Sequence, residues 1–197
     1  MGAKCSASDM GLMQANAHVR KHSAEKRQAH DFYRTPTAAT KALLKVEAFS
    51  SEVWEPACGD GALAQVLIEH GYIVVSTDLF DRGYGAPGYD FLTETVLMAP
   101  SVVTNPPFGL ADEFALHALE LGAEKVALFH RSAWLEGARR HKLLWGPHPP
   151  ARVWQFSKRQ TLWRGDDPEP RSTGGAIPFS WYVWESQHSG PPALGWI

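Results

Sequence analysis

One short stretch of this sequence could activate an amine as a nucleophile. Residues 102–109 read VVTNPPFG, in which a strand-like run ends on Asn105, Pro106, Pro107 and Phe108. The side-chain oxygen of Asn105 and the backbone carbonyl of Pro106 can each accept one N–H of a planar amine, which draws the nitrogen toward a tetrahedral shape. Proline fixes its own φ and has no N–H, so the corner is preorganised. Phe108 can stack on a ring bearing the amine, worth about 1–3 kcal/mol.

A second stretch combines a glycine turn with acidic residues. Residues 54–64 read WEPACGDGALA. Gly59 and Gly61 allow a tight turn and close approach of a ligand, and the helix that follows offers unpaired N–H groups. The run GDGALA fits a loose dinucleotide fingerprint, which is a weak signal alone because ordinary structural turns share it. Asp78 ends the next strand, 19 residues after Gly59, and suits a carboxylate that accepts ribose hydroxyls.

Glu55, just before this turn, bears on the charge of the ligand. A carboxylate there repels a pyrophosphate but suits a cation. S-adenosylmethionine carries a sulfonium, an ammonium and a ribose, and no phosphate. The acidic turn therefore favours S-adenosylmethionine over NAD. The alternative for these residues is a purely structural turn followed by a solvated strand end.

The order of these motifs resembles that of a known enzyme family. E-P-A-C-G-D-G resembles the first motif of S-adenosylmethionine-dependent methyltransferases. Together with N-P-P-F it is similar to the DNA methyltransferases that modify adenine N6, and the runs RSAWLEGARR, ARVWQFSKRQ and SWYVWE resemble the small phage-type members. The resemblance covers roughly residues 31–185. N-P-P-F is specific for methylation of amino nitrogens, although RNA N6 and protein glutamine N5 methyltransferases resemble it too.

The resemblance implies transfer of a methyl group to adenine N6 in DNA by direct displacement, after base flipping. A neutral thioether leaves, so positioning is the main catalytic device and no metal is required. The segment D-F-Y-R-T-P at 31–36 is implied to close over the methionine end, and Tyr-Asp-Phe at 89–91 to surround the cofactor's adenine. The expected catalytic residues are Asn105, Pro106, Pro107 and Phe108. The expected cofactor-binding residues are Phe32, Tyr33, Thr35, Pro36, Glu55, Pro56, Ala57, Gly59, Gly61, Asp78, Leu79, Asp90, Phe91 and Asn105.

A basic segment supplies the expected nucleic-acid contacts. Residues 130–164 hold eight Lys and Arg against one acid, Glu136, which is +7 in a chain whose total is −2. Four tryptophans that could stack or wedge are interleaved, and the short insertions predict little sequence preference. The alternative is a helix and strand with solvated basic faces. The expected contacts are Arg131, Arg139, Arg140, Lys142, Lys158, Arg159 and Arg164. Arg152 is the eighth basic residue of the segment, and the tryptophans are Trp134, Trp145, Trp154 and Trp163.

Alternating strand-like and helix-like runs must position these residues. Such alternation implies parallel βαβ units, hence an α/β, doubly wound, mostly parallel sheet with helices on both faces. The resemblance makes it a seven-stranded Rossmann-like sheet, and the Gly/Pro-rich link before the last strand favours an antiparallel edge strand. Pro36 is expected to begin the first helix with Thr35 as its cap. The expected strands are 52–54, 72–79, 101–104, 125–130, 151–159 and 179–185; the expected helices are 37–49, 61–71, 110–122 and 132–146.

Composition bounds the class of protein. With 197 residues, 44% apolar and 20% charged, the chain suits one soluble domain. We expect a mobile arm over 1–30, a catalytic domain over 31–188 and an irregular tail over 189–197. No run approaches the roughly 18 apolar residues of a membrane span. The two cysteines form no CxxC pair, so the reducing cytoplasm of a bacterium or phage-infected cell is expected, with a role in protection or DNA modification.

Other functions were weighed against this one. An NAD-dependent oxidoreductase leaves Asn105–Phe108 unexplained, and an intact N-P-P-F argues against a non-catalytic nucleic-acid-binding protein. Cytosine C5 methylation needs a cysteine nucleophile, and neither Cys5 nor Cys58 follows the Pro-Pro corner. Cys58 is expected to pack the glycine turn. The basic segment argues against a protein substrate but does not separate DNA from RNA. A metal site at His18, His22 and His30 is not expected, because no carboxylate or cysteine is spaced to complete it.

Overall fold

The computed structural model describes residues 32–164 and 175–197. The chain divides into two compact units, Met1–Phe32 and Tyr33–Ile197, and every element below belongs to the second. The predicted arm lies outside the described residues, as do Cys5 and the three arm histidines.

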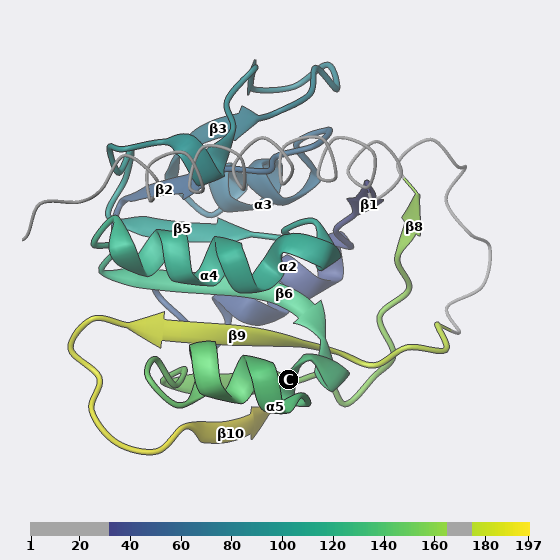
Figure 1. Ribbon diagram of the computed structural model, residues 1–197. Coiled ribbons are helices and arrows are strands. Elements are labelled where there is room, and N and C mark those ends of the chain that lie inside the picture. Colours follow the sequence, from purple (N-terminus) through teal and green to yellow (C-terminus); the bar gives the residue numbers. More distant parts are fainter. Residues whose placement is uncertain (1–31, 165–174) are drawn as a thin grey trace, which may run out of the picture. The chain divides into compact units, whose positions relative to one another are not determined.

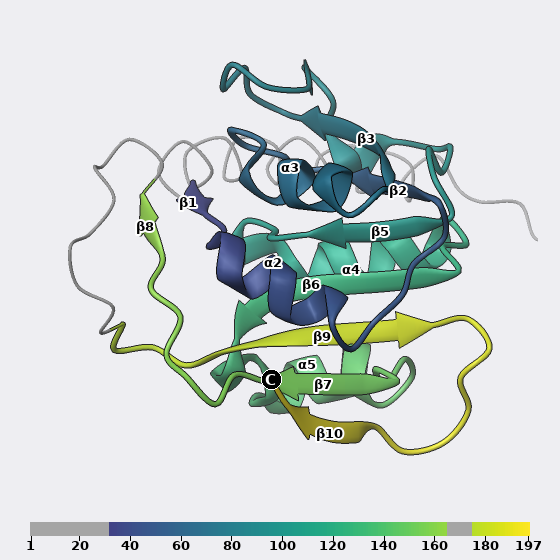
Figure 2. The ribbon, with the colours of Figure 1, turned by 180° about the vertical axis from the view of Figure 1, so that it is seen from behind.

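A mixed β-sheet with helices on both faces forms the second unit (Figure 1). In the described residues the sheet has eight strands, in the order β10-β7-β9-β6-β5-β2-β3-β4. Helices α4 and α5 cover one face (Figure 1), and α2 and α3 cover the other (Figure 2). The strands are β2 (Glu52–Glu55), β3 (Ile73–Asp78), β4 (Ala86–Pro87), β5 (Ser101–Thr104), β6 (Lys125–Arg131), β7 (Arg152–Gln155), β9 (Phe179–Glu185) and β10 (Ala193–Trp196); the helices are α2 (Thr37–Leu44), α3 (Ala62–Glu69), α4 (Ala111–Glu120) and α5 (Ala138–Arg140).

Shorter elements complete the chain. Antiparallel strands β1 (Tyr33–Arg34) and β8 (Trp163–Arg164) form a separate two-stranded sheet. The 3₁₀ helices are η1 (Phe91–Thr93), η2 (Phe108–Leu110) and η3 (Ser132–Leu135), and η4 (His141–Trp145) is a π-helical turn. The predicted α/β, doubly wound class is confirmed, with β9 antiparallel to both of its neighbours.

Some details differ from the prediction. The antiparallel strand β9 lies between β6 and β7 rather than at the edge, and the predicted irregular tail contributes the edge strand β10, parallel to β7. Gly195 makes this pairing possible, because a Cβ at that position would lie 2.2 Å from the Trp154 ring. The predicted helix 132–146 is broken at Gly137, whose φ is +116°. Pro36 rather than Thr35 caps α2, without a side-chain hydrogen bond.

Two apolar clusters fill the two sides of the sheet. One contains Trp54, Phe114 and Trp134, and the other contains Leu43 and Trp181. The interleaved tryptophans are therefore largely structural: Trp134 is buried, the Trp145 ring stacks on Trp184, and Trp154 Nε1 donates to Glu47. Trp134 is therefore not available to stack on nucleic acid, and Trp145 and Trp154 are held in contacts within the chain. Trp163, in β8, is the member of the set to which this correction does not apply.

An ion cluster ties the sheet together at the edge where the parallel strands begin. Arg152, at the start of β7, donates to both Glu47 and Glu185, and Lys125, at the start of β6, pairs with the same two carboxylates at 2.6 and 2.9 Å. Arg152 was counted among the eight basic residues of segment 130–164. Because it is paired with Glu47 and Glu185, it is not free to contact nucleic acid. Burial alone would raise the pKa of Glu47, but hydrogen bonds from Arg152, Lys125 and Trp154 outweigh burial and hold it below its ordinary value.

Replacing Glu47 with glutamine should lower the free energy of unfolding by about 3 kcal/mol, because Arg152 and Lys125 then lose a buried partner. Denaturant unfolding at pH 7 measures this, with exposed Glu52→Gln as a control expected to change it by less than about 0.5 kcal/mol. A carboxylate whose folded pKa is lowered stabilises above its unfolded value and loses that effect as pH falls. The difference between wild type and Glu47→Gln should therefore narrow below pH 4.5; a difference that grows in acid contradicts this assignment.

Candidate functional site

Three neighbouring parallel strands end together and carry the residues singled out from the sequence. β2 lies between β3 and β5, with Trp54 paired to Val102 and Glu55 paired to Ser76. The glycine turn therefore follows β2 on the same edge at which the Asn-Pro-Pro-Phe corner follows β5. The two motifs therefore lie on adjacent strands of one sheet edge. Ligands of open α/β sheets bind at this edge.

Asp78 holds the glycine turn in place. Its Oδ2 accepts a hydrogen bond from Gly59 N–H at 2.9 Å and its Oδ1 accepts one from Phe80 N–H at 2.9 Å. Each carboxylate oxygen can accept one more hydrogen bond, so both retain capacity for a ligand hydroxyl. Asp78 is thus a structural residue of the turn as well as the acid predicted at the strand end.

The loop of residues 81–91 folds back onto this turn. Tyr84 packs so closely on Gly61 that a Cβ there would lie 2.5 Å from its ring, and Gly61 has φ +81°. Cys58 lies beneath, with its thiol directed at the Tyr84 carbonyl at 3.6 Å. Burial, helped by the nearby carboxyl groups of Glu55 and Asp78, raises the pKa of Cys58 to about 12. Cys58 therefore packs the turn as predicted, and is protonated at neutral pH rather than nucleophilic.

Glu55 is a buried acid with an unused oxygen. It is 2% exposed, and its Oε2 has no hydrogen-bond partner among the described residues. Burial raises the pKa of Glu55 well above its ordinary value, Asp78 and Asp60 raise it further, and a hydrogen bond with the Ala64 backbone opposes this. A cationic group beside Oε2 would satisfy this oxygen and favour its ionised form. The residue fits the positively charged ligand that the sequence predicted.

The Asn105 amide has a defined orientation. Its Nδ2 donates to the backbone carbonyl of Tyr33 at 3.0 Å. A carbonyl only accepts, so this contact fixes which side of the amide is nitrogen. The opposite atom, Oδ1, is buried and has no donor among the described residues. The carbonyl of the neighbouring Pro106 also receives no hydrogen bond from the described part of the chain. The corner thus presents two acceptors that lack donors.

Phe108 is already in contact with other side chains. Its ring stacks on Tyr33 with centroids 5.4 Å apart and planes 18° apart, and the Arg131 guanidinium lies 4.7 Å from its centroid. An incoming base would share or replace these contacts, so the predicted stacking on Phe108 requires local rearrangement. Pro107 begins η2, and its carbonyl accepts from Leu110 N–H at 2.9 Å.

His130 is a site residue that the sequence reasoning missed. It ends the buried run of β6, and the Phe108 carbonyl accepts a hydrogen bond from its Nε2 at 3.3 Å. Burial lowers the pKa of His130 to about 4 against opposing hydrogen bonds from the Phe108 and Arg131 backbone, so the ring is neutral at pH 7. The sequence signal that could have identified His130 is its position next to Arg131, at the end of the strand that follows β5 in the chain.

The remaining expected cofactor residues separate into two groups. Tyr89 N–H donates to the Asp78 carbonyl at 3.1 Å, which brings Asp90 back to the strand end, where it also caps η1 through Leu92 N–H. Phe91 does not belong to the site: it is 2% exposed and packs between Trp54 and Phe114, so its predicted contact with the cofactor is wrong. The others lie near the glycine turn or in the segment before α2, with Thr35 and Pro56 buried and Phe32, Pro36, Ala57 and Leu79 partly buried.

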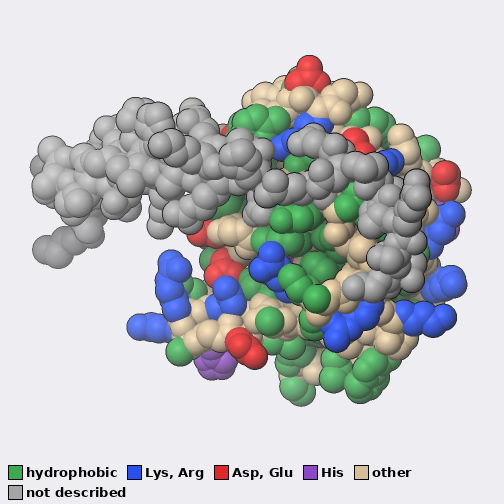
Figure 3. Space-filling view, turned by 90° about the vertical axis from the view of Figure 1, so that its right-hand side faces the viewer, with side chains coloured by type: hydrophobic (Ala, Val, Ile, Leu, Met, Phe, Trp, Pro, Cys, Tyr) green, Lys and Arg blue, Asp and Glu red, His purple; other side chains and the backbone are tan. Residues whose placement is uncertain are grey.

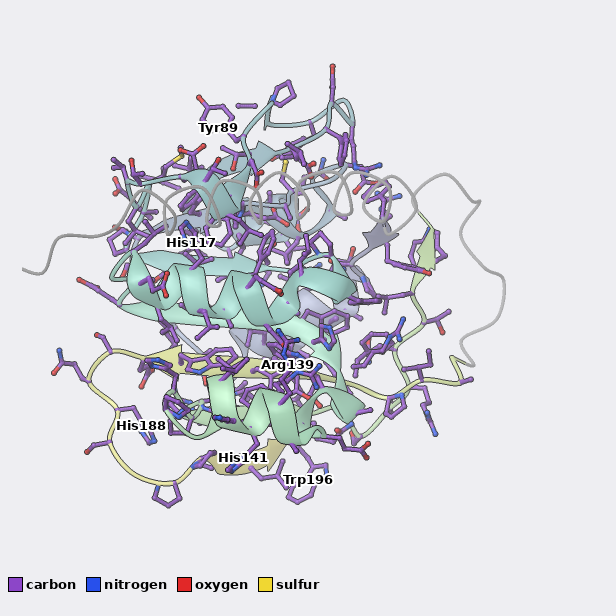
Figure 4. The ribbon with its side chains drawn as sticks, viewed as in Figure 1. Tyr89, His117, Arg139, His141, His188 and Trp196 are labelled. Carbon is purple, nitrogen blue, oxygen red and sulfur yellow. The ribbon has the colours of Figure 1, made fainter. Side chains whose placement is uncertain are left out.

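The basic residues are not equally available. Arg140 donates to Asp112, the Trp134 carbonyl and the Glu136 carbonyl, so its expected role in nucleic-acid contact is corrected to that of an anchor for residues 134–140. Arg159 donates one hydrogen bond to the Ala176 carbonyl. Arg139 lies on the same sheet face as α4 (Figure 4). The exposed cations are Arg139, Lys142, Lys158 and Arg159; Arg131 is partly buried, and Arg164 lies in β8.

Metal ligation and membrane insertion were also considered. Within residues 32–164 and 175–197, no three His, Cys, Asp or Glu residues are grouped to hold a metal ion. No helix of the described part is long and apolar enough to cross a membrane.

Comparison with known proteins identifies the fold. No protein-family model matches the sequence, and no curated protein matches it significantly. Among solved structures, a dimethyladenosine transferase from Plasmodium falciparum matches with a TM-score of 0.53 and 13% identity, over 78% of this chain and 62% of that one. An O-methyltransferase, so named by prediction, from Agrobacterium tumefaciens matches with a TM-score of 0.54 and 12% identity, over 82% and 85%.

A third structure, a presumed hemolysin from Lactococcus lactis, matches with a TM-score of 0.54 and 10% identity, over 83% of this chain and 94% of that one. The chain spans about three-fifths of the first of these proteins and most of the other two. The three together show a shared Rossmann-like fold of the kind found in class I methyltransferases. Since one fold hosts several activities, the activity of this chain must be argued from its own residues.

Proposed function

We propose that this protein transfers a methyl group from S-adenosylmethionine to the exocyclic N6 of adenine in DNA. The Asn105 amide carries the proposal, because it is held by Tyr33 with its acceptor oxygen buried and without a donor among residues 32–164 and 175–197. An adenine amine supplies the two N–H groups that Asn105 Oδ1 and the Pro106 carbonyl lack. One protein of the same fold is a dimethyladenosine transferase, so the fold accommodates an adenosine substrate.

Residues of the glycine turn fit the proposed cofactor. Glu55 offers a buried carboxylate oxygen without a partner to the ammonium or sulfonium, and Asp78 retains acceptor capacity for the ribose hydroxyls. Asp90 lies next to the same strand end through the Tyr89–Asp78 hydrogen bond. When bound, S-adenosylmethionine supplies an electrophilic methyl group on a sulfonium.

The catalytic corner acts by orientation. Asn105 and the Pro106 carbonyl hold the two amine hydrogens, which directs the nitrogen lone pair away from the base plane and toward the glycine turn. His130 fixes the backbone of the corner through the Phe108 carbonyl. The nitrogen–carbon bond forms as the carbon–sulfur bond breaks, and the amine gives up one proton to water. Preorganisation of neutral acceptors is therefore the main contribution of the chain.

Exposed cations flank the edge at which the parallel strands end. Figure 3 views this edge and shows Lys and Arg side chains on both of its lower flanks. Arg139 and Lys142 lie on the segment of α5 and η4, and Lys158 and Arg159 follow β7. A nucleotide flipped out of DNA leaves phosphates on both of its sides. Cations on both sides of the Asn-Pro-Pro-Phe corner would suit these phosphates. The small number of added elements supports a short target or weak sequence preference.

Substituting alanine at Gly61 tests the cofactor turn. The variant should bind S-adenosylhomocysteine at least about 10-fold more weakly, because the new Cβ would meet the Tyr84 ring at 2.5 Å at a φ that already costs about 1–3 kcal/mol. Gly71→Ala is the matched control: its φ of +91° carries a similar backbone strain, but a Cβ there meets nothing within 4 Å, so stability should fall by about 1–3 kcal/mol while affinity holds. Calorimetric titration of both variants decides, and equal affinities would count against the turn as the cofactor site.

Methyl transfer assays test the proposed function directly. Purified protein and radiolabelled S-adenosylmethionine are incubated with duplex DNA, RNA and protein, and the modified nucleoside is identified by mass spectrometry. We expect N6-methyladenine in DNA, spread over many sequence contexts. Label only in RNA or protein would move the proposal to the alternative amine substrates, and label on a carbon atom would refute it. A strict target of six or more base pairs would overturn the weak preference.

A further inference from the structure

Strand β1 contacts both halves of the site. It has only two residues, Tyr33 and Arg34, and pairs with β8 through Arg164 and Trp163. One of its side chains reaches the glycine turn, and the other residue reaches the Asn-Pro-Pro-Phe corner. No other described element makes a polar contact to both, so β1 is positioned to connect them.

Arg34 ties β1 to the glycine turn. Its Nε lies 3.1 Å from Asp60 Oδ2, with 43% and 29% of the two side chains exposed. The other oxygen of Asp60 accepts a hydrogen bond from Ala62 N–H at 3.2 Å, at the start of α3. Asp60 is thus fixed within the turn itself, and movement of the turn is transmitted to the Arg34 guanidinium.

Tyr33 ties β1 to the catalytic corner in two ways. Its carbonyl accepts the Asn105 Nδ2–H, which sets the direction of the amide, and its ring stacks on Phe108. The main-chain contact and the ring contact both depend on where β1 lies. If β1 shifts, the Asn105 amide is free to rotate and the acceptor Oδ1 is no longer held in one direction.

We propose that β1 couples the cofactor turn to the catalytic amide, with Arg34 and Tyr33 as positioning residues. Binding of an adenosyl cofactor at the turn further immobilises Asp60, the Arg34–Asp60 pair passes this restraint to β1, and the Tyr33 carbonyl holds Asn105 more tightly with Oδ1 directed at the amine. The protein is therefore prepared for its amine substrate by its cofactor, which makes cofactor-first binding the productive order. This inference rests on the proposed function and adds an order of events to it.

The small number of asparagines makes the coupling measurable at the side-chain amide of Asn105. The sequence contains two asparagines, Asn16 and Asn105. Protein labelled with ¹⁵N only in asparagine side chains therefore gives two amide proton pairs in a heteronuclear NMR spectrum, and the Asn105→Ala variant identifies one of them. Titration with S-adenosylhomocysteine then reports directly on the Asn105 amide, without any knowledge of the nucleic-acid target.

The decisive comparison is between Arg34→Ala, Arg34→Lys and a matched control. Lys41→Ala removes another exposed ion pair, Lys41–Glu69 at 3.8 Å, which also leads to α3 and whose acid is 63% exposed against 29% for Asp60. In wild type and in Lys41→Ala, the cofactor product should shift the Asn105 amide pair and slow its exchange with water. In Arg34→Ala the cofactor product should still bind, with affinity lower by no more than about 5-fold for a partly exposed ion pair, but the Asn105 response should be lost. Arg34→Lys should restore part of it.

Two outcomes would overturn the coupling in distinguishable ways. An Asn105 response in Arg34→Ala equal to that of wild type refutes the role of β1 and leaves the proposed function intact. Failure of S-adenosylhomocysteine to bind the wild-type protein refutes the proposed function, and the coupling with it. Melting temperatures of Arg34→Ala and Lys41→Ala within a few degrees of each other exclude a merely structural loss. Tyr33→Phe, which keeps both the carbonyl and the ring, should respond like wild type, whereas Tyr33→Ala should respond weakly.

Discussion

Asn105→Ala should abolish methyl transfer, with a loss of about 10²–10³-fold in rate at saturating cofactor. The substitution removes the buried acceptor oxygen that the corner presents and the hydrogen bond to the Tyr33 carbonyl. Affinity for S-adenosylmethionine should change by less than about 5-fold, since Glu55, Gly59 and Asp78 are untouched. Rates are measured by radiolabel transfer to DNA and affinity by calorimetric titration.

Asn105→Asp serves as the companion variant. Aspartate keeps an acceptor oxygen but cannot donate to the Tyr33 carbonyl, so its activity should lie between those of Asn105→Ala and wild type. Activity of Asn105→Ala within about 5-fold of wild type would show that the Asn-Pro-Pro-Phe corner is a structural turn. A parallel collapse of cofactor affinity would show that Asn105 acts mainly in cofactor binding.

Asp78→Ala should weaken cofactor binding by about 100-fold or more. The change removes the acceptor of Gly59 N–H and of Phe80 N–H, so the glycine turn loses its support, and it removes the proposed ribose contact as well. Loss of two hydrogen bonds to a charged group costs roughly 1.5–3 kcal/mol each, part of which appears as lower stability. Titration with S-adenosylhomocysteine measures the affinity, and thermal unfolding separates the loss of stability.

Asp81→Ala is a close control for this experiment. Asp81 is exposed in the next loop and its Oδ1 accepts from Gly83 N–H at 3.0 Å, so it shares the local chemistry of Asp78 without a place at the strand end. Its affinity for the cofactor product should remain within about 3-fold of wild type. A dissociation constant for Asp78→Ala that matches that of Asp81→Ala would refute the ribose role.

Local patterns predicted the parts of the fold that depend on local physics. Strand-like runs of the sequence predicted β5 and β9 with their bounds. The direction of the Asn105 amide could not be predicted, because it depends on a carbonyl 72 residues earlier in the chain. The same limit hid His130, whose partner Phe108 lies 22 residues earlier in the chain, in η2.

Charges and aromatic rings counted along the chain predicted the binding surfaces less well than apolar runs predicted the strands. Arg140 belongs to a predicted basic surface but donates to Asp112, 28 residues away, and Arg152 donates to Glu47, 105 residues away. Phe91 follows the acid of the predicted adenine site but faces the core. A run of basic residues shows only composition. Whether a charged or aromatic side chain is free to bind a ligand depends on the partner that it meets in the folded chain.

The ion cluster of Glu47, Lys125, Arg152 and Glu185 has a consequence for how this protein could change. It fastens three strands at the edge where the parallel strands begin, while every residue assigned to chemistry lies at the edge where they finish. Loops at the chemical edge are therefore open to exchange, in evolution or in the laboratory, with little damage to folding. Changing the DNA preference that we propose for this protein should accordingly begin with the segments after β6 and β7.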